Sequence, residues 1–412
     1  MSWCDLHQSK TTSVRINRDK IGLFKRLVFN SMQIQSENSD YQPAKGTSAS
    51  AILSTVQSLL IATLDQISFL YHTIYYFLLS LIPGIPPHAG PASQHLPNRS
   101  ENCRPIVVIT GTSTGIGRDA AMALAKYGYT VFCIVRKASD GESILGEFKQ
   151  RLKEDNVDLQ GYFFIMDLAD ESTIGVCVEK MIKTSRDIQQ PIVALVNNAG
   201  MATIRASEML TPQAIQSLYQ CNLFGPMQLT RLLLPTLREN KGRVINIGSV
   251  AAIISPPWYG IYAGSKMAMR AWTDTLRGEL VPHSVSVSLI EPGTIKTPIL
   301  SKTSADFVQV YQHDDWNQAT NGPDLRDVYP VEMLARIFKM GEETGCDVQH
   351  TTRAIVHAVT AKWNLSRYLV GMDARGLSLL IEYILPRHLV DLIVRVVFRV
   401  QHSIQEDIQK QD

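Results

Sequence analysis

The sequence lacks the features that mark disulfide-rich, metal-binding or nucleic-acid-binding proteins. Its 412 residues carry a net charge of only +2, and no basic block is interleaved with aromatic residues, so no nucleic-acid partner is predicted. The cysteines form no Cys-x-x-Cys pair and have no histidine cluster nearby, which favours neither a disulfide framework nor a metal site. Cys133 and Cys177 are interpreted as core residues. The six cysteines are Cys4, Cys103, Cys133, Cys177, Cys221 and Cys346.

Charge is also scarce in one long segment near the N-terminus. Residues 1–50 are polar and are expected to have little fixed structure, whereas residues 51–83 form a hydrophobic run whose only full charge is Asp65. The run is long enough for a bilayer span of about 20 residues, and we predict a membrane anchor. A helix in the lipid interface, or one packed on the rest of the protein, is the alternative. Residues 84–104 read as a linker rich in Pro, Ser and Asn.

A glycine-rich turn follows the linker and organises the rest of the chain. Residues 105–110 form an apolar run typical of a buried parallel strand, and a strong helix former begins after the glycines. A strand that turns through glycines into a helix lets the backbone approach a pyrophosphate at the helix N-terminus. A tight turn needing positive φ is the plainer interpretation, but the flanking strand and helix favour a dinucleotide site. The turn contains Gly111, Thr114, Gly115, Ile116 and Gly117.

Beyond the turn, apolar runs alternate with helical patterns, which is typical of a parallel sheet covered on both faces. We predict an α/β protein with a doubly wound, seven-stranded parallel sheet, the Rossmann fold, and an N-terminal hydrophobic membrane segment. The nucleotide-binding catalytic domain is expected over 105–300, and a substrate lid, the last strand and C-terminal helices over 301–412. The predicted strands are 105–110, 130–135, 161–166, 192–196, 243–247, 285–290 and 367–370.

The residues that follow the second and third strands bear on the choice of cofactor. The second strand ends in Arg136 and Lys137, where a site for NAD usually has an acidic residue. A guanidinium suits a ribose 2′-phosphate, so Arg136 favours NADP(H) over NAD(H), although a solvated basic pair is the alternative. Asp167 ends the third strand and could accept a hydrogen bond from an adenine amine or cap the next helix.

Two groups of asparagines stand out in the middle of the chain. Asn197 and Asn198 precede Ala199 and Gly200 at the end of a buried strand. A turn would explain them, but their amides could also pin neighbouring strands while the small residues leave room for a cofactor. Asn222 lies inside a long helical pattern, where asparagine is unfavourable, and this predicts a specific hydrogen-bonding role.

The candidate chemistry lies in Ser249, Tyr262 and Lys266. Ser249 ends a strand at the carboxyl edge of the sheet, where ligands bind in such folds. Tyr262 and Lys266 are four residues apart on the next helix and therefore face the same side. A nearby ammonium favours the phenolate, so Lys266 is expected to lower the pKa of Tyr262 toward the range useful for proton transfer. Ser249 would stabilise charge on a substrate oxygen.

With these motifs in order, residues 105 to about 300 resemble the short-chain dehydrogenase/reductase family. Gly264 stands where Ala is common, which puts nothing essential in doubt. Residues 131–136, 256–266 and 367–371 are similar to the branch of retinol and 17-beta-hydroxysteroid dehydrogenases. The motifs are Thr110-Gly111-x-x-x-Gly115-Ile116-Gly117, Asp167, Asn197-Asn198-Ala199-Gly200, Asn222, Ser249, Tyr262-x-x-x-Lys266 and Glu291-Pro292-Gly293-x-Ile-x-Thr297.

The resemblance implies a role for each matching residue. The tyrosine is the general acid/base, and the lysine lowers its pKa and binds the nicotinamide ribose. The serine orients the carbonyl group, and Asn222 holds a water in a proton relay. The stretch of Pro292, Gly293 and Thr297 covers the nicotinamide.

The C-terminal third says less about function. Residues 298–330 are expected to form a lid, which can order on binding. Residues 377–400 have apolar residues at helical spacing with arginines between them, and could dock on a membrane or pack on the sheet. Five large apolar residues are candidates for an apolar substrate pocket, although side chains at such positions are equally often ordinary core residues. They are Met201, Trp258, Tyr259, Phe307 and Trp316.

Together these features predict a membrane-attached, NADP(H)-dependent oxidoreductase that interconverts a small lipophilic alcohol and its carbonyl. We expect it at the endoplasmic reticulum with a cytosolic catalytic domain, and a homodimer is compatible with the sequence. The alternatives are an NAD-dependent dehydrogenase of a small polar alcohol and, from another class, a catalytically silent binding or scaffold protein. The silent protein is disfavoured because no tyrosine, lysine or glycine of the motifs is lost.

Overall fold

The computed structural model describes residues 104–155, 160–299, 301–303, 339, 341, 343–362 and 364–397. The predicted polar N-terminus, hydrophobic run, linker and most of the lid lie outside these residues. Within the described part of the chain, no helix is both long and apolar enough to cross a membrane.

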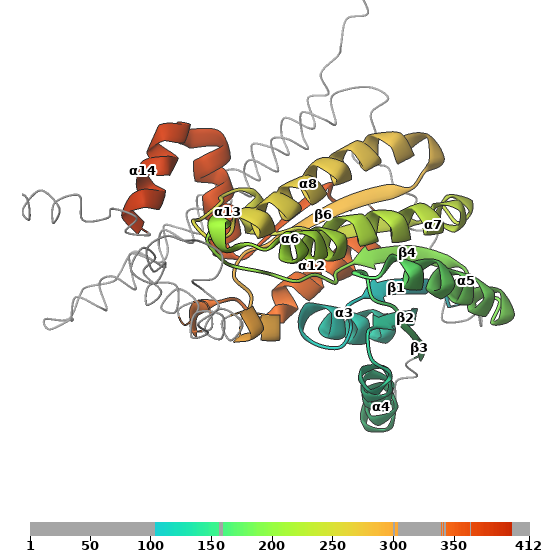
Figure 1. Ribbon diagram of the computed structural model, residues 1–412. Coiled ribbons are helices and arrows are strands. Elements are labelled where there is room, and N and C mark those ends of the chain that lie inside the picture. Colours follow the sequence, from blue (N-terminus) through green and yellow to red (C-terminus); the bar gives the residue numbers. More distant parts are fainter. Residues whose placement is uncertain are drawn as a thin grey trace, which may run out of the picture. The chain divides into compact units, whose positions relative to one another are not determined.

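The seven predicted strands are all present and form one parallel sheet, with strand ends that differ from the predicted ones by at most two residues. Their order is β3-β2-β1-β4-β5-β6-β7, so the direction of winding reverses between β1 and β4 (Figure 1). In a doubly wound sheet, ligands bind beside such a reversal, at the carboxyl ends of the strands. The strands are β1 Ile106–Thr110, β2 Thr130–Val135, β3 Gln160–Ile165, β4 Ile192–Asn197, β5 Arg243–Ile247, β6 Ser286–Pro292 and β7 Arg367–Val370.

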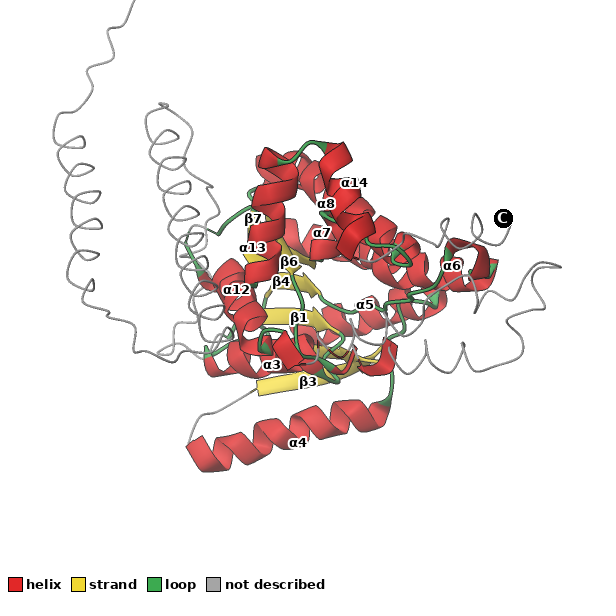
Figure 2. Cartoon of the chain, turned by 90° about the vertical axis from the view of Figure 1, so that its left-hand side faces the viewer, coloured by secondary structure: helices red, strands yellow, loops and turns green. Residues whose placement is uncertain are grey.

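Helices cover both faces of the sheet, as the alternating pattern predicts. Successive residues of β1 point to opposite faces: Val107 belongs to the core beneath α3 and α12, and Val108 to the core beneath α5 and α7. Figure 2 shows α3 and α12 on one side of the strands and α5 on the other. The helices are α3 Gly115–Lys126, α4 Ala138–Asp155, α5 Glu171–Asp187, α6 Pro212–Tyr219, α7 Gly225–Glu239, α8 Gly260–Leu280, α12 Val348–Thr360, α13 Met372–Ser378 and α14 Arg387–Val397.

Short non-α turns interrupt this pattern at several places. Two of them are π-helical, η4 at Gln220–Phe224 and η8 at Leu379–Ile384. The 3-10 turns are η3 Ser207–Met209, η5 Val250–Ala252 and η6 Val281–His283. Single π-turns are frequent at functional sites, and η4 contains one of the predicted site residues.

Two expectations about the core and the tail can be compared with the structure. Cys133 and Cys177 are buried among apolar side chains, which confirms that they are core residues. In the tail, Val390 of α14 is buried, whereas Leu389, Leu392 and Ile393 of the same helix remain exposed. Helix α14 therefore does not bury these three side chains against the sheet.

Candidate functional site

The turn between β1 and α3 has three positions that favour glycine. Gly111 and Gly115 have φ values of +71° and +59°, which favour glycine. Gly117 has no side chain because a Cβ there would lie 2.3 Å from the Gly111 carbonyl oxygen. Thr114 precedes the helix and is exposed, its side chain makes no capping hydrogen bond, and the first turn of α3 has no acidic residue. The N-terminus of α3 is thus suited to an anion such as a pyrophosphate.

The end of β4 is tied to this turn by amide hydrogen bonds. Asn198 donates from its side chain to the Thr110 carbonyl oxygen at 2.9 Å, and its backbone N–H donates to the Thr110 hydroxyl at 3.0 Å. Ala199 lies so close that a Cβ on Gly111 would be 2.9 Å from the Ala199 Cα. The prediction that this asparagine pins neighbouring strands is confirmed, and its partner is Thr110, the first residue of the glycine motif.

Asn197 takes part in a second, fully buried network on the other side of β4. Its amide nitrogen donates to Asn246 on β5 at 2.8 Å and to Thr230 on α7 at 3.0 Å, and Asn246 in turn donates to Thr273 on α8 at 2.9 Å. Neutral polar groups bury well when they are paired in this way. The network fixes α7 and α8 against the central strands; of its members, only Asn197 was noticed in the sequence.

The two candidate residues for the adenosine half lie at the expected strand ends. Arg136 follows β2 and is exposed. Asp167 follows β3 and accepts a hydrogen bond from the Ala169 N–H at 3.0 Å. The alternative in which Asp167 caps the next helix is wrong, because Asp170 is the N-cap of α5 and accepts from the Ser172 N–H.

Ser249, Tyr262 and Lys266 meet at the carboxyl edge of the sheet, although they come from two elements. Ser249 follows β5 and is held by the 3-10 turn η5, whose Ala251 N–H donates to its hydroxyl oxygen at 3.1 Å. The Ser249 hydroxyl is close enough to Tyr262 to lower the pKa of the phenol. The Lys266 ammonium lies 5.9 Å from the centre of the Tyr262 ring and donates to the Ile247 carbonyl oxygen at 3.0 Å.

Burial dominates the ionisation of Tyr262 and Lys266. The prediction that the pKa of Tyr262 is lowered was wrong. Burial raises the pKa of Tyr262 above its ordinary value, and the nearby Ser249 hydroxyl opposes that rise only in part. Burial also lowers the pKa of Lys266 to about 8. An ammonium that is itself desolvated, and that bonds a backbone carbonyl, does not offset the cost of burying a phenolate.

Asn222 has the specific hydrogen-bonding role that its place in a helix predicted. It lies in the π-turn η4, where its amide accepts from the Met201 N–H at 2.8 Å and donates to the Met201 carbonyl oxygen at 2.9 Å. Its nitrogen also donates to the Ser265 hydroxyl on α8 at 3.1 Å. A Cβ on Gly200 would lie 3.2 Å from the Asn222 carbonyl oxygen and 3.6 Å from the Lys266 nitrogen. Asn222 therefore joins the loop after β4 to the helix that bears Tyr262.

The stretch after β6 closes the site on the side of the glycine turn. Pro292 is the last residue of β6, and the Gly293 N–H donates to the Val370 carbonyl oxygen of β7 at 2.8 Å. Thr297 lies at the glycine turn, where its methyl group would be 3.4 Å from a Cβ on Gly115. Ile116, whose exposure is intermediate, packs against the adjoining core.

The residues proposed for the apolar substrate pocket are only partly described. Met201 is exposed, Tyr259 lies beside Tyr262 with ring centres 6.4 Å apart, and Trp258 has an unusual positive φ of 69°. A non-glycine residue in that region is strained, and such strain is often found at functional sites. Phe307 and Trp316 lie outside the described residues.

The departure at position 264 has a steric reason. A Cβ on Gly264 would lie 2.6 Å from the Tyr219 hydroxyl oxygen. Tyr219, from the end of α6, therefore occupies the space that an alanine methyl group would need.

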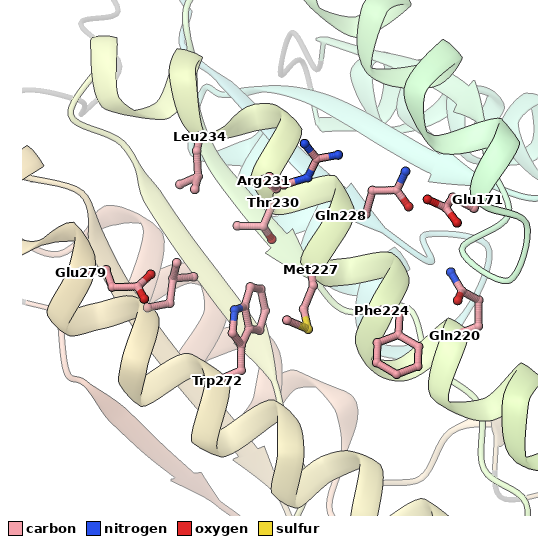
Figure 3. A pocket seen from close by; sticks show the side chains of 11 residues that line it. Glu171, Gln220, Phe224, Met227, Gln228, Thr230, Arg231, Leu234, Trp272 and Glu279 are labelled. Atoms are coloured by element: carbon pink, nitrogen blue, oxygen red, sulfur yellow. The ribbon is translucent and has the colours of Figure 1, made fainter.

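A groove of about 560 Å³ lies elsewhere, between α7 and α8. Figure 3 shows Trp272 and Met227 facing each other across it, with Glu279, Arg231 and Glu171 around them. Its lining includes none of the predicted site residues, so it is separate from the candidate active site.

Comparison with known proteins decides the family. The family model for short chain dehydrogenase matches residues 105–307. The chain is 32% identical over 298 residues to retinol dehydrogenase 5 of Mus musculus and 30% identical over 295 residues to retinol dehydrogenase 16 of Homo sapiens. In both cases the match covers 70% of this chain and 87% of the relative.

The chain belongs to the short-chain dehydrogenase family. A solved structure of a short-chain dehydrogenase from Streptomyces avermitilis has the same fold, with a TM-score of 0.54 and 22% identity, over 76% of this chain and 99% of that one. The protein is therefore an oxidoreductase with a site for NAD(P)(H), as the short-chain dehydrogenase motifs predicted.

Proposed function

We propose that this short-chain dehydrogenase is a membrane-attached, NADP(H)-dependent enzyme that interconverts a lipophilic alcohol and its carbonyl. The observation that carries the proposal is the cluster of Ser249, Tyr262 and Lys266 at the carboxyl edge of the sheet, the edge that also bears the glycine turn. The names of the two retinol dehydrogenases support a lipophilic substrate.

The residues around the turn fit a dinucleotide. A Cβ on Gly111 would meet Ala199 and a Cβ on Gly117 would meet the Gly111 carbonyl oxygen, so glycine keeps this turn tight. The N-terminus of α3 offers backbone N–H groups for the pyrophosphate. We assign the adenosine end to Asp167 and the nicotinamide side to Asn198, Ala199, Gly200 and Lys266. The stretch from Pro292 through Gly293 to Thr297 would cover that side.

The nicotinamide, when bound, gives or takes the hydride. Tyr262 holds the proton that the substrate oxygen gains or loses, and Ser249 donates a hydrogen bond to the same oxygen. Because burial raises the pKa of Tyr262, the phenol keeps its proton at neutral pH. This is the form that donates a proton to a carbonyl oxygen, so reduction needs no prior ionisation of the tyrosine. Asn222 orders the adjoining loop beside the tyrosine.

The preference for NADP(H) rests on Arg136. It is exposed at the end of β2, where the ribose of a bound dinucleotide would lie, and its guanidinium can bond a 2′-phosphate in a bidentate manner. Thr114 is exposed at the start of α3 and adds a hydroxyl on the same side.

Membrane attachment rests on two parts of the sequence. Residues 51–83 supply the hydrophobic anchor. The nucleotide-binding domain at 105–300, with the last strand and the C-terminal helices after it, would then lie on the cytosolic side of the membrane. The exposed apolar side chains of α14, Leu389, Leu392 and Ile393, supply a second contact for an endoplasmic reticulum membrane. An anchored enzyme would meet its substrate where that substrate dissolves.

Two Asn-x-Ser sequences, at Asn98 and Asn364, test the orientation because they can be glycosylated only in the lumen. Asn364 is buried in the folded chain and donates to the hydroxyls of Ser286 and Ser288. We expect both asparagines to stay unmodified. A glycosidase-sensitive mass shift at Asn98 would contradict the cytosolic orientation.

The decisive experiment is a substrate panel with both cofactors. Purified full-length protein should turn over retinoids or steroids faster than short polar ketones and alcohols, and faster with NADPH than with NADH. Preference for a small polar alcohol with NAD would support the alternative dehydrogenase, and cofactor binding without turnover would support a silent binding protein.

The membrane anchor has a test of its own. Removal of residues 1–100 should release an active catalytic domain from membranes. Full-length protein that is soluble without detergent would contradict the anchor.

A further inference from the structure

The stretch Gly293–Thr297 is held by a segment that follows it by about 80 residues in the sequence. The Asp373 carboxylate accepts a hydrogen bond from the Thr294 backbone N–H at 2.6 Å. Its other oxygen accepts from the Ala374 N–H at 2.9 Å, at the start of α13. One carboxylate therefore links the loop after β6 to the first turn of a C-terminal helix.

The contact is so close that two glycines are required around it. A Cβ on Gly293 would lie 1.9 Å from an oxygen of Asp373, and a Cβ on Gly371 would lie 2.6 Å from the same atom. Gly371 also has a φ of +98°, which side chains rarely adopt. The glycine of the Pro292-Gly293 pair is thus needed for packing against Asp373.

The opposite edge of the loop is held as well. The Cys346 N–H donates to the Thr294 carbonyl oxygen at 2.8 Å, and the Lys296 N–H donates to the Cys346 carbonyl oxygen at 2.9 Å. With Asp373 on the other edge, both backbone groups of Thr294 are bonded. The loop then continues to Thr297, which lies against the glycine turn.

Helix α13 is itself anchored to the catalytic helix, so Asp373 has a firm base. Glu382 in η8, which continues α13, pairs with Arg270 on α8 and with Arg367 on β7. Arg270 is four residues beyond Lys266 on α8, and Arg367 also pairs with Glu291, which is buried at the end of β6. The segment from Gly371 to Glu382 therefore connects the loop after β6 to the helix that bears the tyrosine.

We propose that Asp373 is a positioning residue for the cofactor, which acts by holding the Thr294 amide and thereby the loop from Pro292 to Thr297. This inference rests on the proposed function, because the loop is assigned to the nicotinamide side there. Asp373 itself touches neither substrate nor reacting atoms.

The experiment measures NADPH affinity by fluorescence titration of the full-length protein, without a need for turnover. Asp373→Ala should raise the dissociation constant about tenfold, the scale of one lost hydrogen bond to a charged group. Asp373→Asn keeps an acceptor of the same reach and should restore most of the affinity. Steady-state kinetics should show a larger rise in the KM for NADPH than fall in kcat, because a saturating cofactor refills the site.

Two further variants keep the test decisive. Asp373→Ser is suited to the start of a helix, yet its hydroxyl is too short to reach the Thr294 amide, so it serves if Asp373→Ala does not fold. Gly293→Ala places a methyl group where the Asp373 carboxylate lies, so it should also weaken NADPH binding. Because both changes break the same contact, the double variant Gly293→Ala/Asp373→Ser should bind NADPH no more weakly than the weaker of the two single variants. The matched control is Asp274→Asn, which removes an exposed carboxylate bonded to Arg277 on α8 and should leave affinity unchanged.

The outcomes separate this inference from the proposed function. If wild type binds NADPH and both Asp373→Ser and Asp373→Ala bind it equally well, Asp373 has no positioning role. A loss of thermal stability with an unchanged dissociation constant would likewise contradict the proposal, since it would show a purely structural contact. If wild type binds neither NADPH nor NADH, the proposed function fails first.

Discussion

The two halves of the candidate site are built from different kinds of groups. The cofactor half, on β1 and β4, consists of glycines, backbone groups and neutral side chains such as Thr110 and Asn198. The chemical half, on β5 and α8, contains Tyr262 and Lys266, whose pKa values burial shifts in opposite directions. Steric fit governs the first half, and desolvation governs the second.

This difference predicts how substitutions in each half affect the stability of the fold. A cradle of backbone groups fails when atoms are added, because it has no space to give. A buried ionisable pair costs folding free energy, which a protein retains where function needs it. Substitutions in the two halves should therefore have effects of opposite sign on stability.

The largest effect is expected in the cofactor half, from Gly117→Ala. Its Cβ would lie 2.3 Å from the Gly111 carbonyl oxygen and 2.5 Å from the Asn198 amide nitrogen, so backbone must move. We expect a loss of about 3 kcal/mol or more in unfolding free energy, together with loss of NADPH binding. Chemical denaturation and fluorescence titration measure both.

Gly175→Ala on α5 is the matched control, since a Cβ there meets nothing within 4 Å. It should be neutral or stabilising by up to about 1 kcal/mol. Equal behaviour of the two variants would show that Gly117 is not part of a tight cradle.

In the chemical half, Lys266→Met should stabilise the protein while it abolishes turnover. Burial lowers the pKa of Lys266 to about 8, below its ordinary 10.5, so the unfolded chain holds this proton more tightly than the folded one. The resulting penalty is complete below about pH 8 and decreases as the pH rises toward 10.5, so stability from this group increases with pH.

Thermal unfolding of both proteins at about pH 7 and about pH 9.5 measures this difference. The melting temperature of Lys266→Met should exceed that of wild type by several degrees at the lower pH, and the gap should narrow at the higher pH. A variant less stable than wild type near neutral pH would show that the lysine contributes net stabilisation.

A smaller effect is expected from Arg136→Asp at the edge of the cofactor half. Replacing a guanidinium by a carboxylate near the 2′-phosphate should change the ratio of NADPH to NADH affinity by about ten- to a hundredfold. Lys137→Asp makes a similar charge change one residue later and should shift the ratio less. Unchanged ratios, or a wild type that prefers NADH, would contradict the assignment of Arg136.

The features predicted from sequence are those encoded over short distances. The glycine turn, the Tyr262-x-x-x-Lys266 motif and each of the seven strands are all encoded by a few consecutive residues. The direction of the Tyr262 pKa was missed because burial depends on how distant elements pack. The link between Asp373 and Thr294 was missed because it joins residues 79 apart in the chain. Asp167 was one candidate for the N-cap of the helix after the third strand, but the N-cap of α5 is Asp170, three residues later in the chain.

The central claim, that Tyr262 carries the proton, is tested most directly by Tyr262→Phe. Turnover and NADPH affinity should be measured on the same full-length preparation, beside Tyr259→Phe, which removes the neighbouring phenol. General acid/base catalysis contributes about 10²–10⁴ in rate, so Tyr262→Phe should lose that factor, keep wild-type affinity for NADPH, and lose far more than Tyr259→Phe. Retention of more than about a tenth of the activity by Tyr262→Phe would contradict the claim.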